Sequence, residues 1–234
     1  MNILAIGAHP DDLEILCGGT LAKYSKKGHK VFMAHLCNGN MGGKDIPMEQ
    51  LAEIRNNEAK KAGEIIGAEV LGPVCDDLGV LFTQEMRAKV TDIVRKACPD
   101  LIITHSPQDY MTDHIITQQL VFDAAFSATL PNYKTEFPAH EKITPIYYMD
   151  TILGLKSQPE FYVDITDYFE TKKAMLASHE SQYKWLKGHH ITDPFIMIET
   201  TAKFRGLQAG VLYAEGFTIE KVWGRIPPLD LLPI

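Results

Sequence analysis

The first 130 residues alternate short apolar runs with longer amphipathic segments, and this alternation restricts the possible folds more than any other feature. The apolar runs are rich in strand-forming residues, and in the intervening segments apolar residues recur with helical spacing. We expect strands at 2–7, 30–37, 68–72 and 100–105, and helices at 18–28, 48–67, 83–99 and 111–130. Alternating strands and helices favour an α/β fold, with a mostly parallel sheet and helices on both faces.

The remaining 100 residues are less regular. We expect strands at 145–152 and 161–165 and helices at 167–188 and 195–210, whereas 212–224 fits either a strand or a loop. No Pro/Gly/Ser-rich linker, repeat or low-complexity tract interrupts the chain. We therefore expect residues 1–234 to form a single domain.

Composition argues against several classes of protein. The net charge is −7 and no basic block occurs, so a nucleic-acid partner has no electrostatic support. No apolar run approaches the roughly 18 residues of a membrane span, and the N-terminus lacks the features of a signal peptide, so we expect a cytoplasmic protein. The cysteines are widely spaced and predict free thiols rather than a cysteine zinc site. They are Cys17, Cys37, Cys75 and Cys98.

Polar clusters directly follow two of the expected strands. The segment "AHPDDLE" covers 8–14, and "SPQDYMTDH" covers 106–114. In parallel sheets of this kind, sites form outside the carboxyl ends of the strands. The two loops are therefore expected to share one crevice.

The first of these loops has residue types suited to a catalytic metal. His9 and Asp12 lie three residues apart and could supply two ligands. A catalytic zinc takes three protein ligands and leaves one position open, and His114 is the leading candidate for the third. Asp11 would then be free to act as general base on a metal-bound water. The alternative is that Asp11 or Asp12 only caps the following helix.

Four segments resemble the PIG-L/LmbE family of zinc-dependent N-deacetylases. They are "AHPDDLE", "RNNEAKKAGEIIGAE" (55–69), "DLIITHSPQDYMTDHIIT" (100–117) and "YAEGF" (213–217). The resemblance implies a Rossmann-like fold, Zn²⁺ as cofactor, and removal of an N-acetyl group from a small-molecule amino-sugar substrate of the N-acetylglucosamine type. By position it makes His9, Asp12 and His114 the zinc ligands and Asp11 the base.

The chain departs from this family in its second motif. The family commonly has His-Pro-Asp-His where this chain has Met111-Thr112-Asp113-His114. The first family histidine would stabilise the oxyanion or protonate the leaving amine, and a thioether can do neither. Either another group replaces it, with Tyr110, His105 and His179 as candidates, or turnover is poor, or the loop has a different register. We also expect Tyr110 and Asp113 to contact the substrate.

Several other residues allow either a functional or a structural interpretation. Arg55 is placed where the family has a substrate-contacting arginine, or it is a solvated helix residue. Asp77 would bind sugar hydroxyls, or belong to a turn or helix cap. Glu14 is expected to be structural and His179 to lie on the surface. Glu215 would close the pocket or pair with Arg55.

Two functions from different classes remain. The leading hypothesis is a zinc-dependent N-deacetylase, and the alternative is a catalytically weak sugar- or nucleotide-binding protein on the same fold. A redox nucleotide enzyme is excluded, because "GAHPDD" stands where a G-x-G-x-x-G fingerprint would follow the first strand. The apolar segment 226–234 would dock onto a neighbouring subunit, giving a homo-oligomer, or onto its own core.

Overall fold

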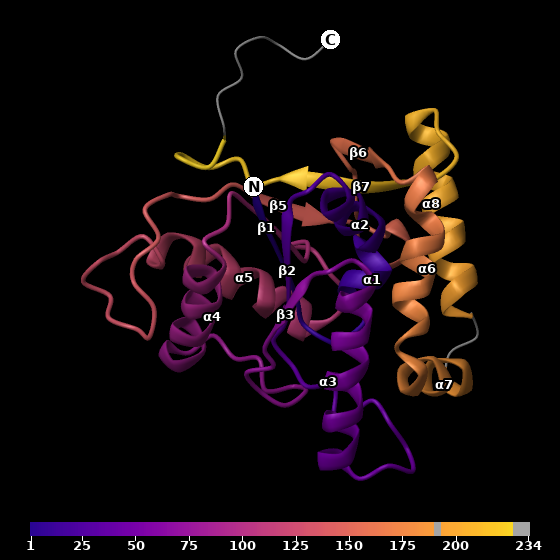
Figure 1. The fold of residues 1–234 in the computed structure, drawn as a ribbon, viewed down its shortest axis with the longest axis horizontal. Coiled ribbons are helices and arrows are strands. Elements are labelled where there is room, and N and C mark those ends of the chain that lie inside the picture. The colour runs from indigo at the N-terminus through magenta and orange to yellow at the C-terminus, as the bar shows by residue number, and fades with distance from the viewer. Residues whose placement is uncertain (190–192, 227–234) are drawn as a thin grey trace.

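The computed structural model describes residues 1–189 and 193–226. Within these residues, one sheet of seven strands has the order β3-β2-β1-β4-β5-β7-β6 (Figure 1). The strands are β1 (Asn2–Gly7), β2 (Lys30–His35), β3 (Glu69–Leu71), β4 (Leu101–Thr104), β5 (Ile146–Met149), β6 (Phe161–Asp164) and β7 (Ala214–Ile219). Strands β1 to β5 are parallel, and β7 is antiparallel to its neighbours β5 and β6. The predicted α/β fold with a mostly parallel sheet is confirmed.

The helices connect these strands. They are α1 (Asp12–Leu16), α2 (Gly18–Lys26), α3 (Met48–Ile65), α4 (Gln84–Ala97), α5 (Thr112–Ser127), α6 (Phe169–Ala177), α7 (Glu180–His189) and α8 (Pro194–Ala209). Local sequence explains where α4 begins. The Thr83 hydroxyl accepts a hydrogen bond of 3.2 Å from the Met86 N–H at the start of α4, as the preference for Thr at helix N-termini predicts.

One predicted helix is wrong. The segment 167–188 contains two helices, α6 and α7, because the chain turns at Ser178 and His179. His179 is almost fully buried, and its ring faces Glu14 of α1.

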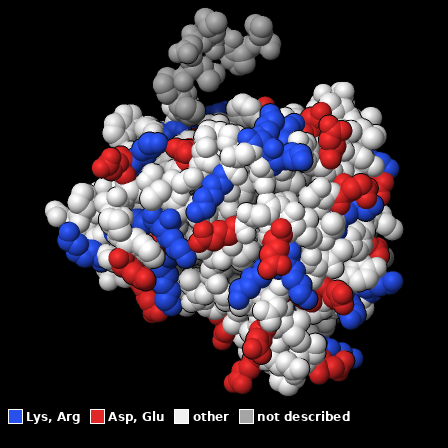
Figure 2. Space-filling view, in the orientation of Figure 1, with Lys and Arg blue, Asp and Glu red and all other residues white. Residues whose placement is uncertain are grey.

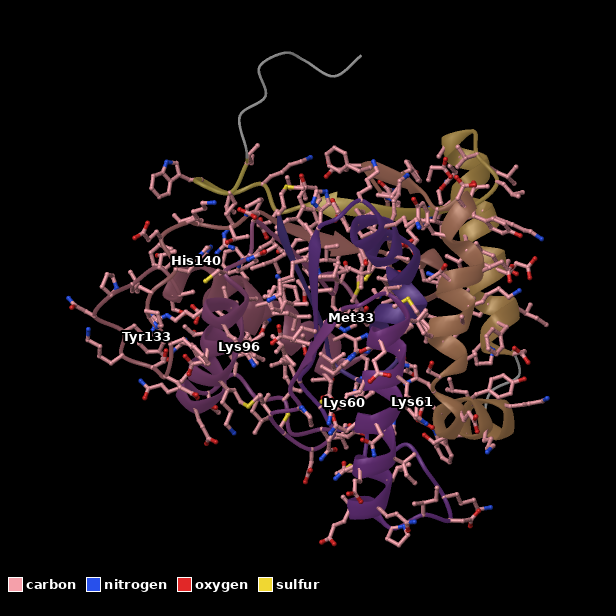
Figure 3. The ribbon with its side chains drawn as sticks, viewed as in Figure 1. Met33, Lys60, Lys61, Lys96, Tyr133 and His140 are labelled. Atoms are coloured by element: carbon pink, nitrogen blue, oxygen red, sulfur yellow. The ribbon has the colours of Figure 1, made fainter. Side chains whose placement is uncertain are left out.

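Buried side chains on the two faces of the sheet make two apolar cores. Leu4 and Ile6 of β1 pack with residues of α4 and α5. Ile3 and Ala5 of the same strand pack on the other face with α1, α2 and α3, and so does Met33 of β2, labelled in Figure 3. In Figure 1, α4 and α5 lie on one side of the parallel strands, and α1, α3 and α6 lie on the other. A strand buried on both faces needs a continuous apolar sequence, which is what residues 2–7 supply.

The strand order places a topological switch at β1. The chain moves outward from β1 through β2 to β3 and then returns to β4 on the other side of β1. The loops that leave β1 and β4 therefore diverge at the same edge of the sheet, which is where sites form in folds of this kind.

No helix within residues 1–189 and 193–226 is long and apolar enough to cross a bilayer. On the face drawn in Figure 2, positive and negative side chains are interspersed. Residues 227–234 lie outside the described part of the chain, so the docking of the C-terminal segment stays a prediction.

Candidate metal and catalytic site

The loop between β1 and α1 forms a tight turn around its own hydrogen bonds. The backbone N–H of His9 donates to Asp12 Oδ2 at 2.7 Å, and the Asp12 N–H donates to the His9 carbonyl oxygen at 3.2 Å. Between them, Asp11 has a φ of 119°, an uncommon conformation for a residue other than glycine. Such backbone strain concentrates at functional sites.

The three predicted metal ligands converge. His114 Nε2 lies 3.3 Å from Asp12 Oδ1, and His9 Nδ1 lies 3.5 Å from Asp12 Oδ2. One ligand atom from each residue falls within 4.8 Å of the other two, and all three residues are buried. Ligands on a tetrahedral zinc with bonds of about 2.0–2.1 Å are roughly 3.4 Å apart. Two imidazole nitrogens and a carboxylate oxygen at these distances fit a divalent metal.

Each imidazole is fixed on its far side by a second carboxylate. His9 Nε2 hydrogen-bonds Asp113 Oδ2 at 3.1 Å, and His114 Nδ1 hydrogen-bonds Asp109 Oδ1 at 3.0 Å. These bonds leave His9 Nδ1 and His114 Nε2 facing Asp12. Carboxylates commonly orient metal-binding histidines in this way. The sequence reasoning missed Asp109, although it lies only five residues before His114.

Charge within this cluster favours protonated imidazoles. Burial lowers the pKa of His9, but hydrogen bonds to Asp113 and Asp12 outweigh it and raise the pKa to about 10. Burial also lowers the pKa of His114, but the carboxylates of Asp12 and Asp109 outweigh this effect and raise the pKa to about 9. Their protons must leave before both nitrogens can bind an ion.

Asp11 lies next to the metal ligands without being one of the three. Its carboxylate is buried, and its Oδ1 lies 3.5 Å from Arg55 Nη2. Burial raises the pKa of Asp11 to about 6, although the Arg55 charge opposes the shift. A buried carboxylate held at this position has the features of a general base.

Arg55 connects α3 to two loops of the site. It is 2% exposed, and its guanidinium donates to the carbonyl oxygens of Pro10 and Gly39. The alternative of a solvated helix arginine is therefore wrong. Its predicted contact with a substrate stays a prediction.

Two of the other predicted substrate contacts are buried. Asp77 is buried, and its carboxylate accepts the N–H groups of Gly39 at 2.8 Å and Met41 at 3.0 Å. Asp113 is also buried, with its Oδ2 shared between His9 and the Leu78 N–H. Their roles in binding a substrate stay predictions.

Tyr110 is 74% exposed, and its ring packs edge-on against His114 with 5.5 Å between centroids. His105 and His179, the two other candidates to replace the family histidine at Met111, are both buried. His105 Nε2 accepts the Ala8 N–H at 2.9 Å, and burial is the main cause that lowers its pKa to about 4. Of these candidates, Tyr110 is the one that reaches solvent.

Two expectations about supporting residues are corrected. His179 does not lie on the surface, because its Nε2 faces Glu14 Oε1 at 3.2 Å inside the protein. Glu215 does not pair with Arg55 but with Lys172, and its carboxylate accepts the N–H groups of Gly19 and Thr20 at the start of α2. Glu14 is fully buried, consistent with a structural residue.

A Rossmann-like sheet with two histidines and an aspartate gathered at its switch point defines a class: an α/β protein with a candidate metal centre. Residues 4–125 match the family described as PIG-L, GlcNAc-PI de-N-acetylase. The chain belongs to the PIG-L family.

Similar proteins include deacetylases and a hydratase. The chain is 29% identical over 230 residues to the diacetylchitobiose deacetylase of Thermococcus kodakarensis, covering 92% of this chain and 81% of that one. It is 24% identical over 248 residues to the 4-oxalmesaconate hydratase of Pseudomonas putida, covering 96% and 90%. The crystal structure of the N,N'-diacetylchitobiose deacetylase from Pyrococcus horikoshii superposes with a TM-score of 0.81 at 29% identity, covering 93% and 83%. Family membership alone therefore leaves more than one reaction to consider.

Proposed function

We propose that this chain is a metal-dependent amide hydrolase that removes the N-acetyl group from an N-acetylglucosamine-type conjugate, with residues 1–234 acting as one deacetylase domain. The observation that carries the proposal is the convergence of His9, Asp12 and His114 beside the buried Asp11 carboxylate. The relatives named as deacetylases support it.

We propose Zn²⁺ as the metal, held by His9, Asp12 and His114. Two nitrogens and one oxygen make a donor set found in catalytic zinc sites. A zinc ion bound there would lower the pKa of a water and polarise a carbonyl oxygen. Asp113 and Asp109 keep the ring planes of His9 and His114 in the orientation that exposes the ligand nitrogens.

Asp11 is the proposed general base. Its carboxylate would accept a proton from the attacking water and pass it to the nitrogen of the departing amine. Arg55 acts as a positioning residue in this proposal, because it approaches Asp11 and holds the carbonyl oxygen of the preceding Pro10. The products are acetate and a free amino sugar.

Tyr110 is the proposed replacement for the family histidine. Its phenol carries a proton at neutral pH and can donate it as a hydrogen bond to a developing oxyanion. Replacing Tyr110 by Phe should lower kcat on the order of 10²-fold, because one oxyanion donor is lost, while KM changes less. Tyr133→Phe, on the loop that follows α5, is the matched control. An unchanged kcat in Tyr110→Phe would remove this role.

A hydratase is the second candidate. Two observations favour it: the 4-oxalmesaconate hydratase aligns with 96% of this chain, and Met111 replaces a histidine that the deacetylase motif commonly contains. Both reactions add water to a trigonal carbon, so the same ligands and base would serve either one. Only the deacetylase reaction breaks a C–N bond.

One experiment separates these functions. Acetate and amine release is measured with diacetylchitobiose and other N-acetylglucosamine compounds, with and without a chelator, and consumption of 4-oxalmesaconate is followed in parallel. Chelator-sensitive acetate release is the expected result. Consumption of 4-oxalmesaconate without any acetate release would replace the proposal with the hydratase. Binding of a sugar without turnover of any compound would favour the binding-protein alternative.

A further inference from the structure

Two cysteines face each other beside the candidate metal centre. Cys37 follows β2 and Cys75 follows β3, and the two residues are directly paired as a parallel bridge. Hydrogen bonds fix this register on both sides: the Cys75 N–H donates to the Leu36 carbonyl at 3.0 Å, and the Asn38 N–H donates to the Cys75 carbonyl at 3.0 Å. Paired residues of adjacent strands point to the same face with backbones about 4.8 Å apart. Disulfides span Cα separations of roughly 4.4–6.8 Å, so the pairing is compatible with one.

The two thiols have different environments. A hydrogen bond between them is the largest cause that raises the pKa of Cys37 and lowers the pKa of Cys75. Cys37 is fully buried, whereas Cys75 is partly exposed. Cys75 is therefore the sulfur that a small reagent reaches first, and Cys37 lies behind it as a resolving thiol.

Cys37 also adjoins the residues that orient a metal ligand. Its Sγ lies 3.9 Å from Asp113 Oδ2. The same carboxylate oxygen accepts hydrogen bonds from His9 Nε2 at 3.1 Å and from the Leu78 N–H at 3.0 Å. A change at this sulfur therefore affects Asp113 directly and His9 through Asp113.

We propose that Cys37 and Cys75 are a reversible redox modification site that closes to a disulfide when the protein meets a peroxide. The Cys75 sulfur attacks one peroxide oxygen: the S–O bond forms, the O–O bond breaks, and the thiol proton leaves with the released hydroxide as water. The Cys37 sulfur then attacks the oxidised Cys75 sulfur: the S–S bond forms, the S–O bond breaks, and the Cys37 proton leaves with hydroxide as a second water. Two electrons pass from the sulfurs to the peroxide.

Disulfide formation has a consequence for the metal centre. A disulfide sulfur carries no proton, so Cys37 can no longer donate to Asp113 Oδ2, the carboxylate oxygen that orients His9. Changes in the groups that support metal ligands weaken metal binding by about 10- to 100-fold. We expect the oxidised chain to bind Zn²⁺ about 10-fold more weakly than the reduced chain, at the lower end of this range.

The test uses the full chain in its native state. It is treated with hydrogen peroxide, unfolded, alkylated at its remaining thiols, digested and analysed by mass spectrometry, with and without dithiothreitol after the peroxide. The expected result is a peptide pair linked through Cys37 and Cys75 that dithiothreitol separates. Zn²⁺ affinity of the oxidised and reduced chains is measured in parallel.

Two variants control the result. Cys75→Ser should lose the linked peptides, whereas Cys98→Ser, which removes an exposed cysteine, should keep them. If Cys75→Ser does not fold, the wild-type and Cys98→Ser digests still decide the outcome. Complete alkylation of Cys37 after peroxide treatment would show that no disulfide had formed and would overturn the proposal. Equal Zn²⁺ affinity of the oxidised and reduced chains would overturn its coupling to the metal centre.

Discussion

At the scale of single residues, each candidate metal-binding histidine lies between two carboxylates. His9 has Asp12 on one side and Asp113 on the other, and His114 has Asp12 and Asp109. Once each imidazole is neutral, as metal binding requires, the outer carboxylates select which ring nitrogen keeps its hydrogen. The inner carboxylate of Asp12 is then free to share an ion with the two remaining nitrogens.

This arrangement predicts that metal binding releases protons. The pKa values of about 10 for His9 and about 9 for His114 mean that both imidazoles are protonated at pH 7 before an ion binds. Zn²⁺ takes neutral imidazoles, so up to two protons should leave per ion, and Zn²⁺ affinity should rise with pH between pH 6 and about 9. Calorimetric titration in buffers of different ionisation enthalpy counts these protons. Affinity independent of pH across this range would contradict the assignment of these two ligands.

Asp11→Asn tests the general base. Asparagine has nearly the same shape and tolerates a positive φ such as the 119° found here, so the loop should keep its conformation. We expect Zn²⁺ content to stay unchanged and kcat to fall by roughly 10²- to 10⁴-fold, because the amide cannot accept the proton. Asp45→Asn, at an exposed position, is the matched control. Wild-type kcat in Asp11→Asn would show that another group takes the proton.

Sequence reasoning placed His9, Asp12 and His114 together because each follows closely after the end of a parallel strand. It could not find Asp109 as the partner of His114 or the contact of His179 with Glu14. Those contacts depend on loop conformation and on the break between α6 and α7, which hydrophobic periodicity does not encode.

At the scale of elements, a buried carboxylate joins the last strand, β7, to helices α6 and α2. Glu215 of β7 pairs with Lys172 of α6, and both side chains are almost completely buried. The same carboxylate accepts the N–H groups of Gly19 at 3.0 Å and Thr20 at 2.7 Å, where the positive end of the α2 dipole favours a negative charge. This interaction fixes α2 against the C-terminal part of the sheet.

Glu215→Gln should therefore destabilise the fold. The neutral amide leaves the buried Lys172 charge uncompensated, and removing one partner of such a pair costs about 3–5 kcal/mol of unfolding free energy. Denaturant unfolding of both proteins measures the difference. The control is Glu199→Gln, which breaks the exposed pair with Lys203 and should change stability little. Equal effects of the two substitutions would refute the structural role of Glu215.

Most strands and helices followed from local patterns, including the buried strands of the parallel sheet and the Thr83 cap of α4. The break at Ser178 and the pairing of Glu215 with Lys172 did not follow from local patterns. Both depend on contacts between segments distant in sequence, and a helical pattern continues through 167–187 without a glycine or proline to interrupt it.

At the scale of the whole molecule, the sheet order creates the site. Strands β1 and β4 are neighbours although about 100 residues separate them, and their pairing brings the 8–14 and 105–114 loops together. Neither loop contains a complete set of ligands. The candidate metal centre therefore exists only in the folded chain, and metal binding should stabilise the fold.

Zinc titration of the metal-free chain tests the central claim most directly. The metal is removed with a chelator, Zn²⁺ is added back stepwise, and acetate release from diacetylchitobiose is measured at each step. We predict no release from the metal-free chain, a rise in proportion to added Zn²⁺, and saturation at one ion per chain. Undiminished acetate release from the metal-free chain would contradict the account.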